Sequence, residues 1–493
     1  MERAAGILLH PTSLPGRFGV GDLGPAADSF LDWAAAAGQR VWQVLPLGPT
    51  GEGASPYASQ SSHAGNPLLV SPARLVEDGL LPAAALLNTP EFGAGPVDYA
   101  RAEEWKGGVL HASFLHFLSR GPEAMRDAYH DYAVAPEQEW LAEWGLFCAL
   151  KAHHRGSPWF TWEPPFRNRD QAALTTVARQ LTEEIEFHRY VQFLFDRQWR
   201  RVRAEARRRG LLLMGDLPIY VAHDSVDVWL NPTLFQLDEE GRPTFVAGVP
   251  PDYFSPTGQR WGNPLYDWER HVEQGYAWWI ERLRAALRQA DLLRIDHFRG
   301  FAAYWEVPAK ERTAVNGRWV AGPGDAFFDT VRTVFGGLPI VAEDLGVITP
   351  DVEALRRRSG FPGMKVLQFG FGGDDSPHLP HNFTRDTVAY TGTHDNDTVR
   401  GWFAALPDAI RTRALAYLGG DGTAVEQEMI RALYASVADL VIVPLQDVLG
   451  LGGEARMNTP SVTQGNWRWR ARTEQLDLGR ALRLRRLAEA CHR

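Results

Sequence analysis

Short apolar runs recur along the chain, and most of them end in polar or charged residues. Runs of this length, rich in Val, Ile and Leu, are typical of strands that are buried on both faces of a parallel sheet. Eight runs have this character: residues 6–9, 41–47, 211–216, 292–296, 338–343, 364–369, 387–391 and 440–445. Between most of them apolar residues recur at helical spacing, as in residues 25–37, 139–153, 184–209, 277–289, 351–358 and 425–439.

This alternation of strands and helices predicts an α/β fold, a (β/α)8 TIM barrel. The rival is a doubly wound sheet, but no Gly-x-Gly-x-x-Gly motif follows any predicted strand. We therefore expect residues 1–493 to form a single catalytic barrel with helical subdomains inserted in the barrel loops. The largest insertion, residues 68–210 between the second and third strands, should be mainly helical, and residues 245–275 are expected to form a loop.

The composition is that of an ordinary soluble globular protein, with 45% hydrophobic and 23% charged residues. A net charge of −9, without a long basic run, argues against binding to the phosphate backbone of nucleic acids. The chain has no run of about 18 apolar residues that could span a membrane and no hydrophobic signal segment at its start. Its two cysteines, Cys148 and Cys491, form no disulfide framework. We expect a cytoplasmic enzyme without nucleic-acid or membrane partners, and the 18 Trp residues hint at a ligand with sugar rings.

Several predicted strands end in acidic residues. The third ends at Asp216, the fourth at Asp296, the fifth at Glu343, and the seventh leads to Asp395. A single Asp at a strand end often only caps the next helix. In a barrel, however, all the strand ends meet on one face. Converging carboxylates favour glycosidic-bond chemistry, in which one carboxylate attacks the anomeric carbon and another protonates the leaving oxygen.

A metal-dependent hydrolase is the competing hypothesis, because His10, His297 and His394, together with nearby Asp residues, could coordinate a divalent ion on a barrel. The chain has no His-x-His pair and no His-Glu-x-x-His motif beside them. Arg294 and Arg299, which flank Asp296, would also repel a cation. We therefore predict neither a metal ion nor another cofactor.

Three segments resemble the signature regions of the α-amylase clan: Arg294-Ile-Asp-His-Phe298, Val341-Ala-Glu-Asp-Leu-Gly346 and Thr393-His-Asp-Asn396. More closely, the chain resembles the amylomaltases, which are 4-α-glucanotransferases of glycoside hydrolase family 77. Further segments match that family: residues 6–15, 42–50, 215–221, 446–452, 454–460 and 465–467. The resemblance therefore extends over nearly the whole chain.

The resemblance implies a role for each member of an acidic trio. Asp296 would be the nucleophile that forms a glucosyl-enzyme, and Glu343 would be the general acid and then the general base. Asp395 would bind sugar hydroxyls and stabilise the transition state. Arg294 would hydrogen-bond the nucleophile and help to keep it ionised.

The same resemblance implies a set of substrate-binding residues. His394, Asp216 and Tyr57 would line the −1 subsite. Residues 245–275 would cover the acceptor side of the site, like the mobile loop of the family. The other residues implied to bind substrate are Asp252, Tyr253, Phe254, Trp261, Asn263, Pro264, His297, Asn396 and Asn466. One departure is Glu52, which stands where family members often carry an aromatic residue, so a second glucan site there is in doubt.

The implied activity is the transfer of α-1,4-glucan segments between maltooligosaccharides or starch, including intramolecular cyclisation, by a retaining double displacement. The implied partners are α-1,4-glucans and maltooligosaccharides, and a monomer is expected. One alternative is an α-amylase-like hydrolase that uses the same acids with water as acceptor. The other is an inactive glucan-binding protein, against which the intact Asp296, Glu343 and Asp395 argue.

Overall fold

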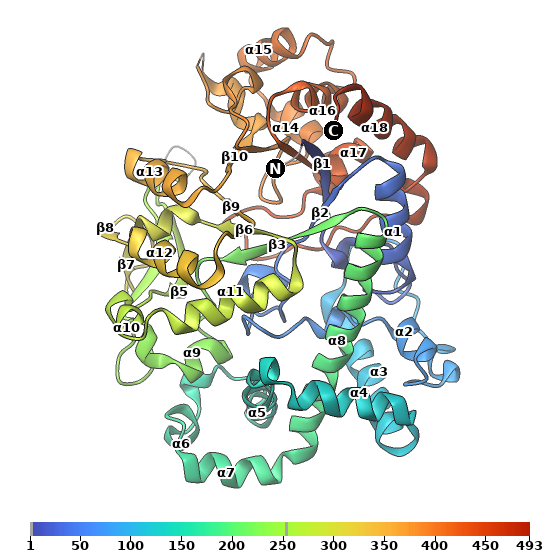
Figure 1. Cartoon of the computed structure of the whole chain (residues 1–493), viewed down its shortest axis with the longest axis vertical. Helices are drawn as coiled ribbons and strands as arrows, with labels where there is room; N and C mark the ends of the chain where they lie inside the picture. The colour runs from blue at the N-terminus through green and yellow to red at the C-terminus, as the bar shows by residue number, and fades with distance from the viewer. Residues whose placement is uncertain (1–2, 252–254, 374) are drawn as a thin grey trace.

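The computed structural model describes residues 3–251, 255–373 and 375–493 of the chain, and its centre is a closed barrel of parallel strands (Figure 1). The barrel strands are β1 (Ala4–Leu8), β2 (Val41–Gln43), β3 (Leu212–Pro218), β6 (Leu292–Asp296), β9 (Ile340–Ala342), β10 (Gly363–Val366), β11 (Thr387–Tyr390) and β12 (Leu440–Pro444). They neighbour one another in chain order, and β12 pairs with β1 to close the barrel. Each of the eight predicted runs supplies one strand, so the predicted barrel is confirmed.

The barrel strands are almost completely buried, which explains their uninterrupted apolar sequences. Tight packing appears at Gly6 in β1, where an added Cβ would lie 2.5 Å from the carbonyl oxygen of Val41. Several strands are shorter than predicted. β9 ends at Ala342, so that Glu343 already belongs to the loop on the carboxyl-end face. The strand ends that carry acidic residues are therefore free to point into a site.

The helices include those that follow barrel strands and those of the insertions. Their bounds are α1 (Pro25–Ala36), α2 (Pro72–Glu77), α3 (Tyr99–Arg120), α4 (Glu123–Val134), α5 (Trp140–His153), α6 (Pro164–Arg167), α7 (Gln171–Gln180), α8 (Thr182–Arg208), α9 (Val226–Leu230), α10 (Trp268–Glu273), α11 (Ala277–Gln289), α12 (Gly324–Phe335), α13 (Pro350–Ser359), α14 (Val399–Ala405), α15 (Asp408–Leu418), α16 (Val425–Ala435), α17 (Leu445–Leu449) and α18 (Leu478–Ala490). Helix α16 ends four residues before the predicted boundary, where the Ser436 hydroxyl donates to the carbonyl of Leu433.

The chain between β2 and β3 contains helices α2 to α8, most of which lie in the lower half of Figure 1. The long helix α8 joins them to the barrel. On α8, Tyr190 stacks on Phe117 of α3 with ring centroids 4.7 Å apart. The buried amide of Gln192 accepts a hydrogen bond from the main-chain N–H of Gly65 (2.7 Å) and donates one to its carbonyl (3.0 Å). This helix therefore also supports the loop that leads to the barrel face.

A four-stranded antiparallel sheet, absent from the sequence-based prediction, lies beside the barrel in the order β5-β4-β7-β8. Its strands are β4 (Phe245–Val249), β5 (Gln259–Pro264), β7 (Ala303–Pro308) and β8 (Arg318–Ala321). Residues 245–275 were expected to form a loop; the structure has β4, β5 and α10 there instead, so that expectation is wrong. Glycine and proline interrupt these short strands, and β5 and β8 are partly exposed, which weakens the hydrophobic pattern. In the described ranges no helix is long and apolar enough to cross a membrane.

Candidate active site

The register of neighbouring parallel strands brings four acidic residues to one end of the barrel. Asp216 of β3 lies opposite Arg294 of β6, and Asp296 closes β6 opposite Pro218. Ile295 pairs with Ala342, the last residue of β9, so Glu343 follows directly beside Asp296. Asp395 comes from the turn after β11. The carboxyl ends of the barrel strands meet on one face, and we call this the strand-end rule. It brings together the acids that the sequence analysis singled out.

A buried ionic cluster forms where β3 and β6 meet. Nη1 of Arg294 donates to both carboxylate oxygens of Asp216 at 2.8 and 2.7 Å, and Nη2 donates to Oδ1 of Asp296 at 2.7 Å. Burial opposes the charge of Arg294, but Asp216 and Asp296 outweigh it and hold the guanidinium pKa well above its ordinary value. Burial raises the pKa of Asp216, and Arg294 opposes that rise. Oδ2 of Asp296 has no hydrogen-bond partner within the described part of the chain and is free to react.

Tyr57 connects this cluster to the turn after β11. Its hydroxyl donates to Oδ2 of Asp216 at 2.6 Å, and its ring stacks on His394 with centroids 5.0 Å apart. Burial, followed by the charge of Asp216, raises the pKa of the Tyr57 phenol well above its ordinary value. Tyr57 is therefore a neutral hydrogen-bond donor to Asp216.

Glu343 has different surroundings from Asp296. Its Oε2 accepts from the main-chain N–H of His297 at 2.7 Å, and its Oε1 accepts from the N–H of Leu345 at 2.9 Å. None of the ion pairs found among the described residues involves its carboxyl group. Burial, reinforced by the charge of Asp296, raises the pKa of Glu343 to about 7. A carboxyl group with this pKa can hold a proton near neutrality and also give it up.

His297 presents its N–H to Glu343 from the left-handed backbone region, with φ of 52°. This conformation is uncommon for a residue with a side chain, and it marks a position under functional constraint. Burial lowers the pKa of His297 to about 4, so the imidazole is neutral. Its ring and that of Trp261 of β5 form a T-shaped pair with centroids 4.8 Å apart, which links the residue that contacts Glu343 to the antiparallel sheet.

Asp395 lies at the open side of the site. Its side chain is 48% exposed, and its Oδ1 lies 3.4 Å from Nε2 of His394. The next residue, Asn396, turns its Oδ1 back to the N–H and the hydroxyl of Thr393, both at 2.9 Å. Asn396 therefore shapes the turn that presents Asp395.

The other predicted binding residues differ in their placement. Trp261 is 39% exposed on β5. The amide of Asn263 donates to the carbonyl of Val221 at 2.8 Å, while Pro264 is buried opposite Val246. The amide of Asn466 bonds to the main chain of Thr459 and Val462, so it holds its own loop together. Asp252, Tyr253 and Phe254 lie outside the described residues.

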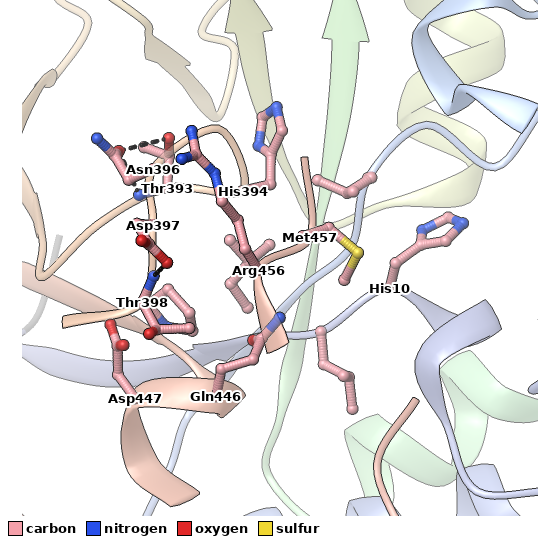
Figure 2. A pocket seen from close by; sticks show the side chains of 14 residues that line it. His10, Thr393, His394, Asn396, Asp397, Thr398, Gln446, Asp447, Arg456 and Met457 are labelled. Carbon is pink, nitrogen blue, oxygen red and sulfur yellow. Dashed lines mark hydrogen bonds between the residues drawn. The ribbon is translucent and has the colours of Figure 1, made fainter. Parts of the chain in front are cut away.

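The sequence analysis missed several polar residues behind the site. They line a pocket between the ends of β1 and β12 and the turn after β11 (Figure 2). Asp447 accepts from the Thr391 hydroxyl at 2.6 Å and from the N–H of Val399 at 2.7 Å, and burial raises its pKa to about 7. Because Asp447 follows β12, the strand-end rule could have found it. Arg456 and Asn458 also contact the turn. The sequence analysis included them only in residues 454–460, a segment that matches the family, and gave them no role.

No group of three or more His, Cys, Asp and Glu side chains within residues 3–251, 255–373 and 375–493 could hold a metal ion. His10 and His394 do approach one another, and burial together with His394 lowers the pKa of His10 to about 3.

A closed (β/α)8 barrel with acidic residues from several strand ends on one face defines a barrel enzyme with a candidate site lined by carboxyl groups. The family model of the 4-alpha-glucanotransferases, glycoside hydrolase family 77, matches residues 9–476, and the chain belongs to this family. The predicted family and enzyme class are therefore confirmed.

Known proteins match the chain over its full length. It is 50% identical to the 4-alpha-glucanotransferase of Thermus thermophilus, with 100% of this chain and 99% of the relative covered. It is 46% identical to the chloroplastic/amyloplastic 4-alpha-glucanotransferase of Solanum tuberosum, with 95% of this chain and 82% of the relative covered. The amylomaltase from Streptococcus agalactiae in complex with acarbose superposes with a TM-score of 0.97 at 38% identity, with both chains covered completely.

Proposed function

We propose that this chain transfers α-1,4-glucan segments between maltooligosaccharides or starch chains by a retaining double displacement. The observation that carries the proposal is the contrast between two neighbouring carboxyl groups. Arg294 holds one oxygen of Asp296 and leaves the other free, whereas Glu343 is buried without an ion-pair partner and has a pKa of about 7. Family membership over residues 9–476 supports the same reaction.

In the first half-reaction, the protonated carboxyl of Glu343 gives its proton to the glycosidic oxygen. Oδ2 of Asp296 attacks the anomeric carbon, so a C–O bond to the enzyme forms as the bond to the leaving chain breaks. In the second half-reaction, the Glu343 carboxylate removes the proton from the 4-hydroxyl of an acceptor glucan. The acceptor oxygen attacks the anomeric carbon and releases Asp296, which retains the configuration.

The other residues bind the sugar and stabilise positive charge at its ring. Asp395 hydrogen-bonds sugar hydroxyls, and Tyr57, Asp216 and His394 line the −1 subsite. The stacked pair of Tyr57 and His394 supports this role, because it forms a continuous wall next to Asp216. Asn396 and Asn466 act through the loops that they hold together.

The acceptor side decides between transfer and hydrolysis. Trp261 offers an exposed indole beside His297, and an aromatic face can stack on the acceptor sugar and displace water. Asn263 and Pro264 fix the course of β5 under this indole. A sugar hydroxyl is therefore the preferred acceptor, and the acceptor can equally be the far end of the same chain, which gives a ring.

Incubation of the pure protein with maltotriose alone tests the proposal. We expect glucose and a ladder of longer oligosaccharides at a constant total of reducing ends. A steady rise in reducing ends would instead indicate an amylase-like hydrolase. An unchanged maltotriose pool would indicate a protein that only binds glucans.

A further inference from the structure

The turn that carries His394 and Asp395 is tied to a segment that follows β12, residues 456–458. Four hydrogen bonds join or stiffen the two segments. The main-chain N–H of Asn458 donates to the carbonyl of His394 at 3.1 Å, and its side-chain Nδ2 donates to Oδ1 of Asp395 at 2.6 Å. Nη2 of Arg456 donates to the carbonyl of Asp395 at 2.6 Å, and its Nε donates to the carbonyl of Asn458 at 2.7 Å. We call residues 456–458 the bracket.

We propose that Arg456 and Asn458 are positioning residues that aim the carboxylate of Asp395 at the sugar. This inference rests on the proposed role of Asp395 in the transfer reaction. Neither residue needs to touch the substrate, since both act through Asp395.

The turn itself fixes the main chain of Asp395, whereas its hold on the carboxylate is weak: Oδ1 lies 3.4 Å from Nε2 of the neighbouring His394. Within the turn, the N–H of Asp395 donates to the hydroxyl of Thr393 at 3.3 Å, and Asn396 bonds back to Thr393. The half-exposed carboxylate would be free to change rotamer without a further contact. Asn458 supplies that contact at Oδ1, and within the described chain Oδ2 is left unpaired and open to a sugar hydroxyl.

The bracket is itself anchored, so it can impose a position on Asp395. Met457 between the two residues is buried, and its carbonyl accepts from the N–H of Trp467 at 2.8 Å. Figure 2 shows the side chain of Arg456 reaching from beside Met457 toward the turn of Thr393 and Asn396. Arg456 contacts one carbonyl in each segment, which keeps the bracket and the turn at a fixed separation.

Two substitutions at position 458 test the proposal. Asn458→Ala removes the donor to Asp395 but keeps the main-chain bond to His394. Asn458→Asp keeps the shape, loses the donor, and keeps the test decisive if Asn458→Ala does not fold. For each variant we expect kcat for maltotriose disproportionation to fall about 10- to 100-fold with KM changed less than about threefold, because a misplaced group costs rate rather than ground-state binding.

Arg456 provides the rescue measurement. Arg456→Met should lower kcat, and Arg456→Lys should restore part of it, since Lys can donate to one of the two carbonyls. The matched control is Asn382→Ala, because the Asn382 amide also donates to a carboxylate, that of Asp375, in an exposed loop. It should leave kcat unchanged.

A double-mutant cycle with Asp395→Ala separates positioning from general support of the fold. The readout is the affinity for acarbose, measured by calorimetry, which does not require an active enzyme. The unsaturated ring of acarbose is flattened like the sugar ring of the transition state, so its affinity reports contacts that matter for rate. If Asn458 acts through Asp395, Asn458→Ala should weaken binding in the wild type and have no further effect in Asp395→Ala. An equal loss of acarbose affinity in both backgrounds would overturn the proposal. An unchanged kcat in both position-458 variants would overturn it too.

The same set of variants separates this inference from the proposed function. If Asp395→Ala transfers glucan at the wild-type rate, the proposed role of Asp395 is wrong, and so is the positioning role of residues 456–458. If transfer requires Asp395 but not Asn458, only the positioning role of residues 456–458 is wrong.

Discussion

The ends of β6 and β9 present the same chemical group in two different environments. At the end of β6, Asp296 and Asp216 both accept hydrogen bonds from Arg294, so each carboxyl group lies beside a cation. After β9, Glu343 is held by two main-chain N–H groups and no cation pairs with it in the described structure. The two strands are direct neighbours in the barrel.

This difference teaches how a single barrel face can place two carboxyl groups in opposite environments. Asp296 lies beside the guanidinium of Arg294, whereas burial, reinforced by the charge of Asp296, raises the pKa of Glu343 to about 7. The environment of Asp296 is set by Arg294, two positions earlier on β6, and that of Glu343 by burial, by the charge of Asp296 and by the main-chain N–H groups of His297 and Leu345.

Removing the acid should have the largest effect. Glu343→Gln keeps the size of the side chain but cannot transfer a proton, so kcat for maltotriose should fall at least about 10³-fold. Acarbose affinity and the circular dichroism spectrum should stay close to those of the wild type. Transfer at more than a tenth of the wild-type rate would contradict the assignment of Glu343.

Replacing the shared cation should have the next largest effect. Arg294→Lys keeps a charge but cannot bond Asp216 and Asp296 at once from a planar group, and we expect a loss of about 10²-fold in kcat/KM. Arg294→Met should be worse and should also lower the melting temperature, because the buried carboxylate of Asp216 and the partly buried one of Asp296 then lack their cation. Equal activity of Arg294→Lys and the wild type would show that the two strand ends need no bidentate cation.

The smallest expected effect is a change in the pH dependence of kcat/KM, which should follow the protonation of Glu343. The first half-reaction needs its protonated form, and its pKa is about 7, so kcat/KM should fall about tenfold per unit as the pH rises above that value. Arg294 opposes the raised pKa of Glu343, so in Arg294→Met this basic limb should move to higher pH. A basic limb at the same pH in both proteins would mean that Arg294 and Glu343 are not coupled.

Apolar runs that end in charge were enough to predict the barrel and the acids of β3, β6 and β9, because parallel strands bury their middles and expose their ends. The antiparallel sheet escaped prediction, since β5 and β8 are short and half-exposed and pair only through contacts remote in sequence.

The environments of the acids could be predicted only in part. Arg294 lies two residues from Asp296, and alternation along a strand already places both on one face. The contact of Asn458 with Asp395 joins two loops that follow different strands, and no local pattern predicts it. The left-handed φ of His297 likewise depends on the packed site, because nothing in its sequence neighbourhood requires it.

The pairing of β1 with β12 sets the order in which this protein can mature on the ribosome. Ala4 lies opposite Leu440, so the first strand to be made stays without one neighbour until the last strand has been made. The bracket of residues 456–458 is made later still, although it holds an acid that is made more than 60 residues earlier. A nascent chain can therefore close the barrel and hold Asp395 in place only after residues 440–458 have been made.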